Sequence, residues 1–143
     1  MKFEFPEDRK YFESLFGVSN IDQCSDFFDF RDPKVKRKEF SLIRKKVFAN
    51  LIEKHGFVCQ LSCHEDCLQK PTQVDHLIPL ATNQLNKKSR RLNALPRKKV
   101  VAQSFGSNNP INLILACSRC NAFKKHKLPD KDMISRIIIK TES

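Results

Sequence analysis

Residues 76–129 contain no aspartate or glutamate, although the same segment holds eleven lysines and arginines. The rest of the chain has sixteen basic and sixteen acidic residues, so the formal net charge of +11 comes from this segment. A long stretch without acidic residues indicates a surface for a polyanion, and we expect that partner to be a nucleic acid. A basic surface kept for solubility is the alternative, but solubility does not require the exclusion of every acidic residue.

The chain also lacks a long apolar run. Residues 1–10 do not contain the apolar segment of a secretory signal, and no later run approaches the ~20 residues of a membrane-spanning helix. We therefore expect a cytoplasmic protein with no membrane partner. In that reducing compartment, the six cysteines are better read as metal ligands or free thiols than as disulfides.

The length of 143 residues suits one domain, or a compact module with an extension. A chain of this size buries somewhat under about 70% of its unfolded surface, so a structural metal would add noticeably to its stability. We divide it into residues 1–56 and a second segment, 57–143, with a basic insertion at 81–110. Residues 1–33 carry a net charge of −4 and seven phenylalanines, which predicts short helices or turns that pack aromatic rings onto the rest. Cys24 stands alone and is assigned to packing.

Apolar residues recur at three- and four-residue steps over 34–55, which predicts an amphipathic helix with a basic polar side. Gly56 is a plausible stop for this helix. Its basic side could contact phosphates or be a plain solvated surface, and the pattern does not decide between them.

Four elements are expected further along the chain. We predict short strands at 73–74 and 113–115, a helix over 118–127 and a short helix around 87–95. The apolar segment 133–140 could be a strand or a helix.

Cys117 and Cys120 have the Cys-x-x-Cys spacing of a zinc knuckle, which supplies two of the four ligands that tetrahedral zinc needs. The second pair must come from Cys59, Cys63 and Cys67, with His64 as a further candidate. Spacing alone leaves this choice open.

Two segments carry the remaining chemistry. The first contains Asp75-His76 at the end of a short apolar run, and the second contains Asn112-Leu113 followed by Cys117-x-x-Cys120-Asn121-x-x-Lys124. This order resembles the HNH (ββα-metal) endonucleases, whose motif reads Asp-His, then Asn-Leu, then Cys-x-x-Cys-(His/Asn)-x-x-Lys. The resemblance implies an α+β fold: a small ββα-metal (His-Me finger) core stapled by a four-cysteine zinc site, with an N-terminal helical extension.

The resemblance also selects the zinc ligands. Many HNH chains carry Cys-Gln and then a second cysteine eight residues before the motif aspartate, which here are Cys59-Gln60 and Cys67. We therefore expect structural Zn²⁺ on four cysteines: Cys59, Cys67, Cys117 and Cys120. Cys63 is the nearest competitor of Cys67.

The catalytic roles follow in the same way. His76 matches the general base, since a neutral imidazole can take a proton from water. Asp75, on the opposite side of an extended strand, and Asn121 would bind catalytic Mg²⁺ or Mn²⁺, which prefer oxygen ligands. Asn112 would hydrogen-bond the loop backbone and so hold His76 in place. The departure is Asn121, where many relatives have histidine, which weakens metal binding.

The expected nucleic-acid contacts lie in the insertion at 81–110 and on the helix expected over 118–127. In the family that the chain resembles, this last helix lies along the minor groove. They are Lys87, Lys88, Arg90, Arg91, Arg97, Lys98, Lys99, Arg119, Lys124 and Lys125. The sequence thus predicts a metal-dependent endonuclease acting on double-stranded DNA, such as a restriction-type enzyme.

One such site cuts one strand, so a double-strand cut needs two copies, as in a symmetric homodimer, or two visits by a monomer. The main alternative is a non-catalytic zinc-containing module that binds nucleic acid. A toxin-like nuclease that acts on RNA is a third possibility.

Overall fold

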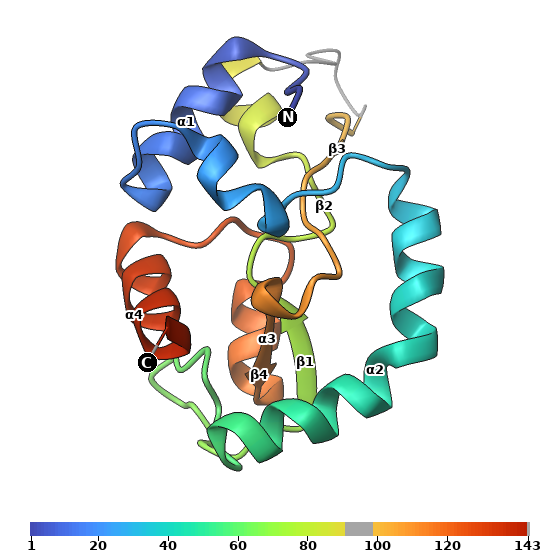
Figure 1. The fold of residues 1–143 in the computed structure, drawn as a ribbon, viewed down its shortest axis with the longest axis vertical. Coiled ribbons are helices and arrows are strands. Elements are labelled where there is room, and N and C mark those ends of the chain that lie inside the picture. The colour runs from blue at the N-terminus through green and yellow to red at the C-terminus, as the bar shows by residue number, and fades with distance from the viewer. Residues whose placement is uncertain (91–98, 143) are drawn as a thin grey trace.

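The structure, a computed structural model, describes residues 1–90 and 99–142. Its elements in chain order are α1 (Pro6–Phe16), the 3₁₀ helix η1 (Ile21–Phe27), α2 (Pro33–His55), β1 (Gln73–His76), β2 (Ala81–Thr82), the π-helical turn η2 (Asn86–Arg90), β3 (Gln103–Ser104), the 3₁₀ helix η3 (Pro110–Asn112), β4 (Leu113–Ala116), α3 (Ser118–Lys124) and α4 (Lys131–Glu142). The chain is therefore α+β, with helices around two small two-stranded sheets (Figure 1). None of the helices in the described ranges is long and apolar enough to cross a membrane.

The first sheet consists of β1 and β4, which run antiparallel with Asp75 opposite Ile114 and His76 opposite Leu113. α3 begins directly after β4 and packs against β1, so that a strand, a strand and a helix lie together (Figure 1). The two predicted strands are confirmed. The predicted helix over 118–127 ends earlier, at Lys124, because Lys125 takes a φ of 50° that an α-helix cannot continue.

The predicted helix over 34–55 is confirmed as α2. Asp32 caps its first turn by accepting from the N–H of Lys34 at 2.9 Å, Pro33 stands at the first helical position, and Gly56 ends the helix at a φ of 86°. Only part of its apolar pattern is used. Phe40, Val47, Phe48, Leu51 and Ile52 pack against one face of the β1–β4 sheet, whereas Val35, Leu42 and Ile43 remain exposed.

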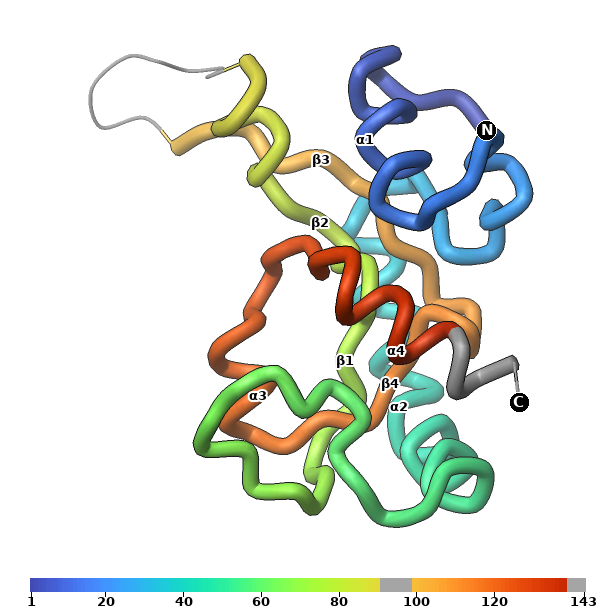
Figure 2. The backbone as a smooth tube through the Cα atoms, turned by 90° about the vertical axis from the view of Figure 1, so that its left-hand side faces the viewer, coloured from blue at the N-terminus to red at the C-terminus, as the bar shows by residue number. Residues whose placement is uncertain are grey.

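The second sheet pairs β2 with β3, with Thr82 opposite Gln103. Residues 83–102 are therefore an excursion between two paired strands, and Figure 2 shows β2 and β3 leading away from the first sheet. The predicted insertion at 81–110 includes both strands. The short helix expected around 87–95 is represented by η2, and residues 91–98 lie outside the described part of the chain.

The aromatic residues of the N-terminal segment pack as predicted. Phe12 is fully buried, and its ring lies 5.7 Å from Phe3, 4.9 Å from Phe28 and 5.0 Å from Phe105, measured between centroids. Cys24 packs against the same cluster. This hydrophobic cluster draws on both predicted segments. Phe12, Leu15 and Ile21 come from 1–56, and Ile114, Leu128 and Ile134 come from 57–143. The two segments therefore share one hydrophobic core.

Residues 131–142 form the helix α4. Asp130 accepts from the N–H of Met133 at 2.8 Å, and the buried Ile134 and Ile137 face the core. Arg136 donates to the carbonyl oxygens of Gln60 and Leu61 at 2.8 and 2.6 Å. α4 is thus attached both to α1, against which it packs, and to the loop that carries the first cysteines.

Lys36 anchors the start of α2 inside the molecule. Its side chain is fully buried, and Nζ donates to three carbonyl oxygens, those of Asp29, Leu80 and Gly106, at 2.6, 2.9 and 2.7 Å. Gly106 is itself required by a close approach, since a Cβ there would overlap Ile78 O and lie 2.7 Å from Pro79 O. These contacts hold the loops before β2 and after β3 against α2.

Candidate active site and metal centre

Four cysteines converge beside α3. Their Sγ atoms, from Cys59, Cys67, Cys117 and Cys120, all lie within 4.8 Å of one another. The Cys67 and Cys117 sulfurs are 3.9 Å apart, and four thiolates at ~2.3 Å from a tetrahedral zinc would be about 3.8 Å apart. The residues present therefore fit a structural metal such as zinc, and the predicted clustering of these four cysteines is confirmed.

Backbone N–H groups point at these sulfurs. Cys117 Sγ accepts from Cys120 N at 3.3 Å and Leu68 N at 3.4 Å, and Cys59 Sγ accepts from Cys117 N at 3.2 Å and Ser62 N at 3.4 Å. Burial opposes ionisation of Cys117, but these donors outweigh it and lower the pKa of that thiol, whereas burial raises the pKa of Cys59. The four thiols cannot all ionise side by side without a cation, which is what a bound metal supplies.

The two competing ligands lie outside this cluster. Cys63 is directed at the backbone of α3, with its Sγ 3.7 Å from the carbonyl oxygen of Cys120. The imidazole of His64 accepts from Asp66 N at 3.0 Å and packs on the ring of Phe123. Spacing alone left both Cys63 and Cys67 as candidates for the fourth metal ligand. The packing of the loop at 59–67 places Cys67 in the cluster.

The β1–β4 sheet presents two different faces. Side chains alternate along a strand, so Gln73 and Asp75 lie on the face toward α3, while Val74 and His76 lie on the face toward α2. In the described part of the chain no strand pairs with the outer edge of β1. Asp75 and His76 therefore flank an unpaired strand edge from opposite sides.

Asp75 is almost enclosed. Its Oδ1 accepts from the N–H of His76 at 2.8 Å, and its Oδ2 is the one buried side-chain oxygen or nitrogen without a hydrogen bond among the described residues. The nearest positive charge is the ammonium of Lys124, 3.3 Å from Oδ2, which attracts the carboxylate without the alignment of a hydrogen bond. Burial raises the pKa of Asp75, and the charge of Lys124 acts in the opposite direction.

His76 is held by Asn108 and Phe40. Its Nε2 lies 2.8 Å from Oδ1 of Asn108, and Phe40 of α2 meets the ring edge-on at 4.6 Å between centroids. The imidazole is 8% exposed. Burial, helped by the charges of Lys124 and Lys36, lowers the pKa of His76 to about 4. The side chain is therefore neutral at physiological pH and can accept a proton.

The orientation of Asn108 determines which nitrogen of His76 carries the hydrogen. Asn108 Nδ2 donates to the carbonyl oxygen of Lys36 at 2.8 Å, so the amide oxygen is the end that faces His76. An oxygen in that place can only accept, and Nε2 of His76 must then be the N–H donor. The lone pair is left on Nδ1, for which no hydrogen-bond partner is found among the described residues.

Asn112 makes the contacts expected of it. It is fully buried, its Oδ1 accepts from Ile78 N at 2.8 Å, and its Nδ2 donates to Ile78 O at 3.0 Å and Ser107 O at 2.9 Å. Its carbonyl oxygen also accepts from Leu77 N at 2.8 Å. These bonds hold the two residues that follow His76.

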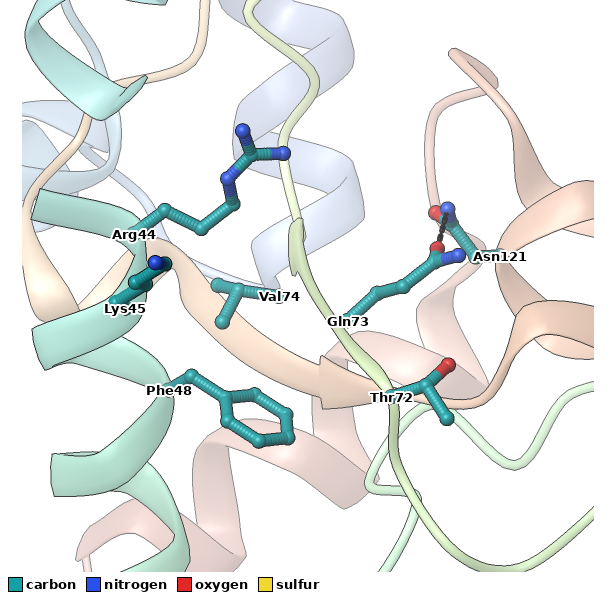
Figure 3. A pocket seen from close by; sticks show the side chains of 7 residues that line it. All are labelled: Arg44, Lys45, Phe48, Thr72, Gln73, Val74 and Asn121. Carbon is teal, nitrogen blue, oxygen red and sulfur yellow. Dashed lines mark hydrogen bonds between the residues drawn. The ribbon is translucent and has the colours of Figure 1, made fainter. Parts of the chain in front are cut away.

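Asn121 lies on the α3 side of β1. Its Nδ2 donates to Oε1 of Gln73 (Figure 3), and its own Oδ1 makes no hydrogen bond to another residue in the described part of the chain. The side chain lines a cavity of about 510 Å³ that extends across the edge of β1 to α2. The other lining residues are Arg44, Lys45, Phe48, Thr72, Gln73 and Val74.

The predicted catalytic residues thus lie close to one strand, but they do not all line the cavity across its edge. Asp75 and Asn121 lie on the α3 side, His76 lies on the α2 side, and only Asn121 lines the cavity. The sequence missed Asn108 and the buried Lys36. The residues around Asn108 are typical of a turn, and nothing in their spacing connects them with a histidine 32 positions earlier.

Two predicted nucleic-acid contacts are corrected. Lys124 is only 3% exposed and donates to the carbonyl oxygen of His76 at 2.9 Å besides facing Asp75. Arg90 is bound to Asp8 at 2.9 Å and to Asn86 and Gln103, under the N-terminal helix. Both cations bind partners within the protein, because acidic groups distant in sequence, Asp75 and Asp8, pack against them.

The other basic residues named from the sequence are exposed or fall outside the described part of the chain. Exposed positions are Lys87, Lys88, Lys99, Arg119 and Lys125, whereas Arg91, Arg97 and Lys98 fall outside the described residues.

Comparisons with known proteins add no assignment. A scan against protein-family models, a search of curated proteins and a search of solved structures each returned no match.

Proposed function

We propose that this protein is a metal-dependent DNA endonuclease of the HNH type that hydrolyses phosphodiester bonds. The observation that carries the proposal is the state of His76: a neutral imidazole whose Nε2–H is donated to Asn108 and whose Nδ1 is left as a proton acceptor. Hydrolysis requires such a base to take a proton from the attacking water. The order of Asp75-His76, Asn112 and Cys117-x-x-Cys120-Asn121 supports the same proposal through its resemblance to that family.

In this proposal a divalent cation would take two oxygen ligands from the groups around β1. Asp75 offers a buried carboxylate oxygen without a hydrogen bond, and Asn121 offers an amide oxygen on the same side of the strand. Mg²⁺ or Mn²⁺ bound there would polarise the phosphate and stabilise the leaving oxygen. In the structure the ammonium of Lys124 lies closest to Asp75 and partly balances its charge.

The chain's own residues then have separate tasks. His76 takes the proton of the water at Nδ1 while Asn108 stabilises the resulting imidazolium through Nε2–H. Asn112 holds residues 77 and 78, so that His76 keeps its place at the end of β1. Lys124 binds the carbonyl oxygen of His76 and fixes the strand edge between α2 and α3.

The cysteine cluster has a structural task in this proposal. It joins the loop at 59–67 to the start of α3, the helix that carries Asn121 and Lys124. Structural zinc contributes roughly 10–16 kcal/mol in small peptides, which is comparable to the net stability of a whole domain. Zinc would therefore determine the position of α3 relative to β1.

The second candidate function is a non-catalytic zinc-containing module that binds nucleic acid. It is favoured by one observation: of Asp75, His76 and Asn121, only Asn121 lines the cavity across the edge of β1. Cleavage would then require that substrate or cation draw these groups together at the outer edge of β1. In the endonuclease proposal the partner is double-stranded DNA, and a restriction-type enzyme would act as a homodimer because each site cuts one strand.

Plasmid nicking separates the two functions. The zinc-loaded protein is incubated with supercoiled plasmid in Mg²⁺ or Mn²⁺, alongside the variants His76→Ala and His126→Ala. Loss of a general base lowers a rate by roughly 10²–10⁴-fold, so His76→Ala should lose nicking and keep duplex binding. His126→Ala removes an exposed histidine and should keep both. Duplex binding by the wild type without nicking in any divalent cation would establish the binding module instead.

A further inference from the structure

The cavity across the edge of β1 is built from three elements. α2 contributes Arg44, Lys45 and Phe48, β1 and the residue before it contribute Thr72, Gln73 and Val74, and α3 contributes Asn121. Figure 3 shows Arg44 extending from α2 toward β1, and Gln73 extending from β1 to Asn121 on the far side. We call this space the α2–β1 groove. Its lining contains two cations and no carboxylate.

α2 is fastened at both ends, and its outer face is exposed to solvent in the middle. The buried Lys36 fastens its first turns through three carbonyl oxygens, and the buried Leu51 packs its last turns on the sheet. Between them, Leu42 is 82% exposed, and α2 passes along the side of the β1–β4 sheet as an arch (Figure 1). The two anchors place Arg44 and Lys45 at a fixed distance from the unpaired edge of β1.

The two cations of the groove have no acidic partner among the described residues. Arg9, Arg31 and Arg90 are each paired with carboxylates, and Arg136 is bound to carbonyl oxygens. No ion pair or hydrogen bond of the Arg44 or Lys45 side chain is found among the described residues. α2 contains only two acidic residues, and the one N-terminal to the groove, Glu39, is bound by Arg31 at 2.7 Å.

We propose that the α2–β1 groove binds the phosphodiester backbone of one strand of a DNA duplex, with Arg44 and Lys45 contacting phosphates next to the one at Asn121. The choice of DNA rests on the function proposed above. The groove would direct the strand along the unpaired edge of β1, between the side of Asp75 and the side of His76. α2 thus lines the second side of the substrate site. This helix lies outside the motif residues that carry the family resemblance.

The lining favours a duplex backbone over an unpaired strand. Proteins that bind single strands present aromatic rings on which bases stack. The one ring in the groove, Phe48, packs instead into the apolar cluster of Leu51, Val74, Leu113 and Leu115. The polar groups that remain for a ligand are two cations, the hydroxyl of Thr72 and the amides of Gln73 and Asn121. Such groups bind phosphate and sugar without reading bases.

Equilibrium binding tests this proposal without any cleavage. A labelled DNA duplex is titrated with zinc-loaded protein, without added Mg²⁺ or Mn²⁺, over a range of salt concentrations. Each lost phosphate contact reduces the slope of log K against log salt by about 0.9. Arg44→Ala should show this reduction and bind roughly 5–10-fold more weakly near 0.1 M salt, whereas Arg44→Lys should keep most of the slope.

Lys46→Ala is the matched control, because Lys46 is exposed on the same helix but does not line the groove. Equal losses in Arg44→Ala and Lys46→Ala, or no loss in Arg44→Ala, would overturn the proposal. Tighter binding of single-stranded DNA or of RNA than of the duplex, with the same dependence on Arg44, would overturn the choice of a duplex. If Arg44 controls duplex binding but the wild type never nicks DNA, the groove stands and the endonuclease proposal fails.

Discussion

Asn108 holds His76 by a single hydrogen bond: its Oδ1 lies 2.8 Å from Nε2 of the imidazole. The amide is oriented in turn by its bond to the carbonyl oxygen of Lys36, at the buried start of α2. The proton-accepting atom of the proposed base is therefore determined by a residue from another part of the chain.

The first prediction concerns Asn108. Asn108→Ala removes the acceptor, so His76 can rotate or change tautomer, and nicking should slow by 10–100-fold, the range for residues that orient an active group. Asn108→Asp keeps an acceptor in place and should recover much of the rate. The ¹⁵N shifts of the His76 ring report the tautomer directly, and an unchanged Nε2–H form in Asn108→Ala would contradict the assignment.

The second prediction is a loss of stability in acid. The pKa of His76 is about 4 in the folded protein and near 6.5 when unfolded, so the unfolded state binds more protons between these values. His76 therefore stabilises the fold fully above pH 6.5, and this contribution is lost as the pH falls toward 4. The expected loss is of the order of 3 kcal/mol.

Urea unfolding at pH 7 and at pH 4.5 measures this loss. The zinc cysteines also respond to acid, so wild type is compared with His76→Gln, which keeps the cysteines and removes the titrating group. The variant should lose less stability than the wild type between the two pH values. Equal losses would show that His76 does not titrate in this range.

The third prediction separates the two cysteines between which spacing could not decide. Cys67→Ala should release zinc and strongly destabilise the protein, because it removes one of four converging thiols. Cys63→Ala should retain a full equivalent of zinc, since the Cys63 thiol faces the carbonyl oxygen of Cys120 and lies outside the four-cysteine cluster. Metal analysis after gel filtration, with thermal unfolding of each variant, checks both results. Retention of zinc by Cys67→Ala with loss in Cys63→Ala would reverse the ligand assignment.

The fourth prediction concerns Lys124, whose ammonium lies 3.3 Å from Asp75. Lys124→Met leaves that buried carboxylate without a counter-charge, which should destabilise the protein by roughly 3–5 kcal/mol without divalent cations. Mn²⁺ should then stabilise the variant more than it stabilises the wild type, because the competing ammonium is gone. Thermal unfolding with increasing Mn²⁺ measures this difference.

Lys125→Ala is the control for that experiment, since its neighbouring side chain is exposed. It should change neither the stability nor the Mn²⁺ response. If Lys124→Met were stable and Mn²⁺ had no greater effect on it, the ammonium would not balance a cation site.

Local patterns in the sequence predicted several elements correctly. Apolar spacing and the turn and capping residues, which act over a few positions, predicted strands at 73–74 and 113–115 and the helix over 34–55. The structure extends these strands to His76 and Ala116. Segment 133–140 could not be assigned, because its apolar pattern suits a strand or a helix equally well. The early end of α3 was missed, since it depends on one residue, Lys125, with a positive φ.

The sequence by itself determined the candidate metal ligands at Cys117 and Cys120, the order of the motif residues and the opposite directions of Asp75 and His76, because spacing and strand alternation are local. Spacing left Cys63 and Cys67 open and the family resemblance favoured Cys67, which the tertiary structure places in the cluster. Only the tertiary structure decided that Asn108 binds His76. It also decided that Lys124 and Arg90 turn inward, toward Asp75 and Asp8. Each of these contacts joins groups far apart in the chain, and whether a cation faces water or a buried carboxylate depends on which segments pack against it.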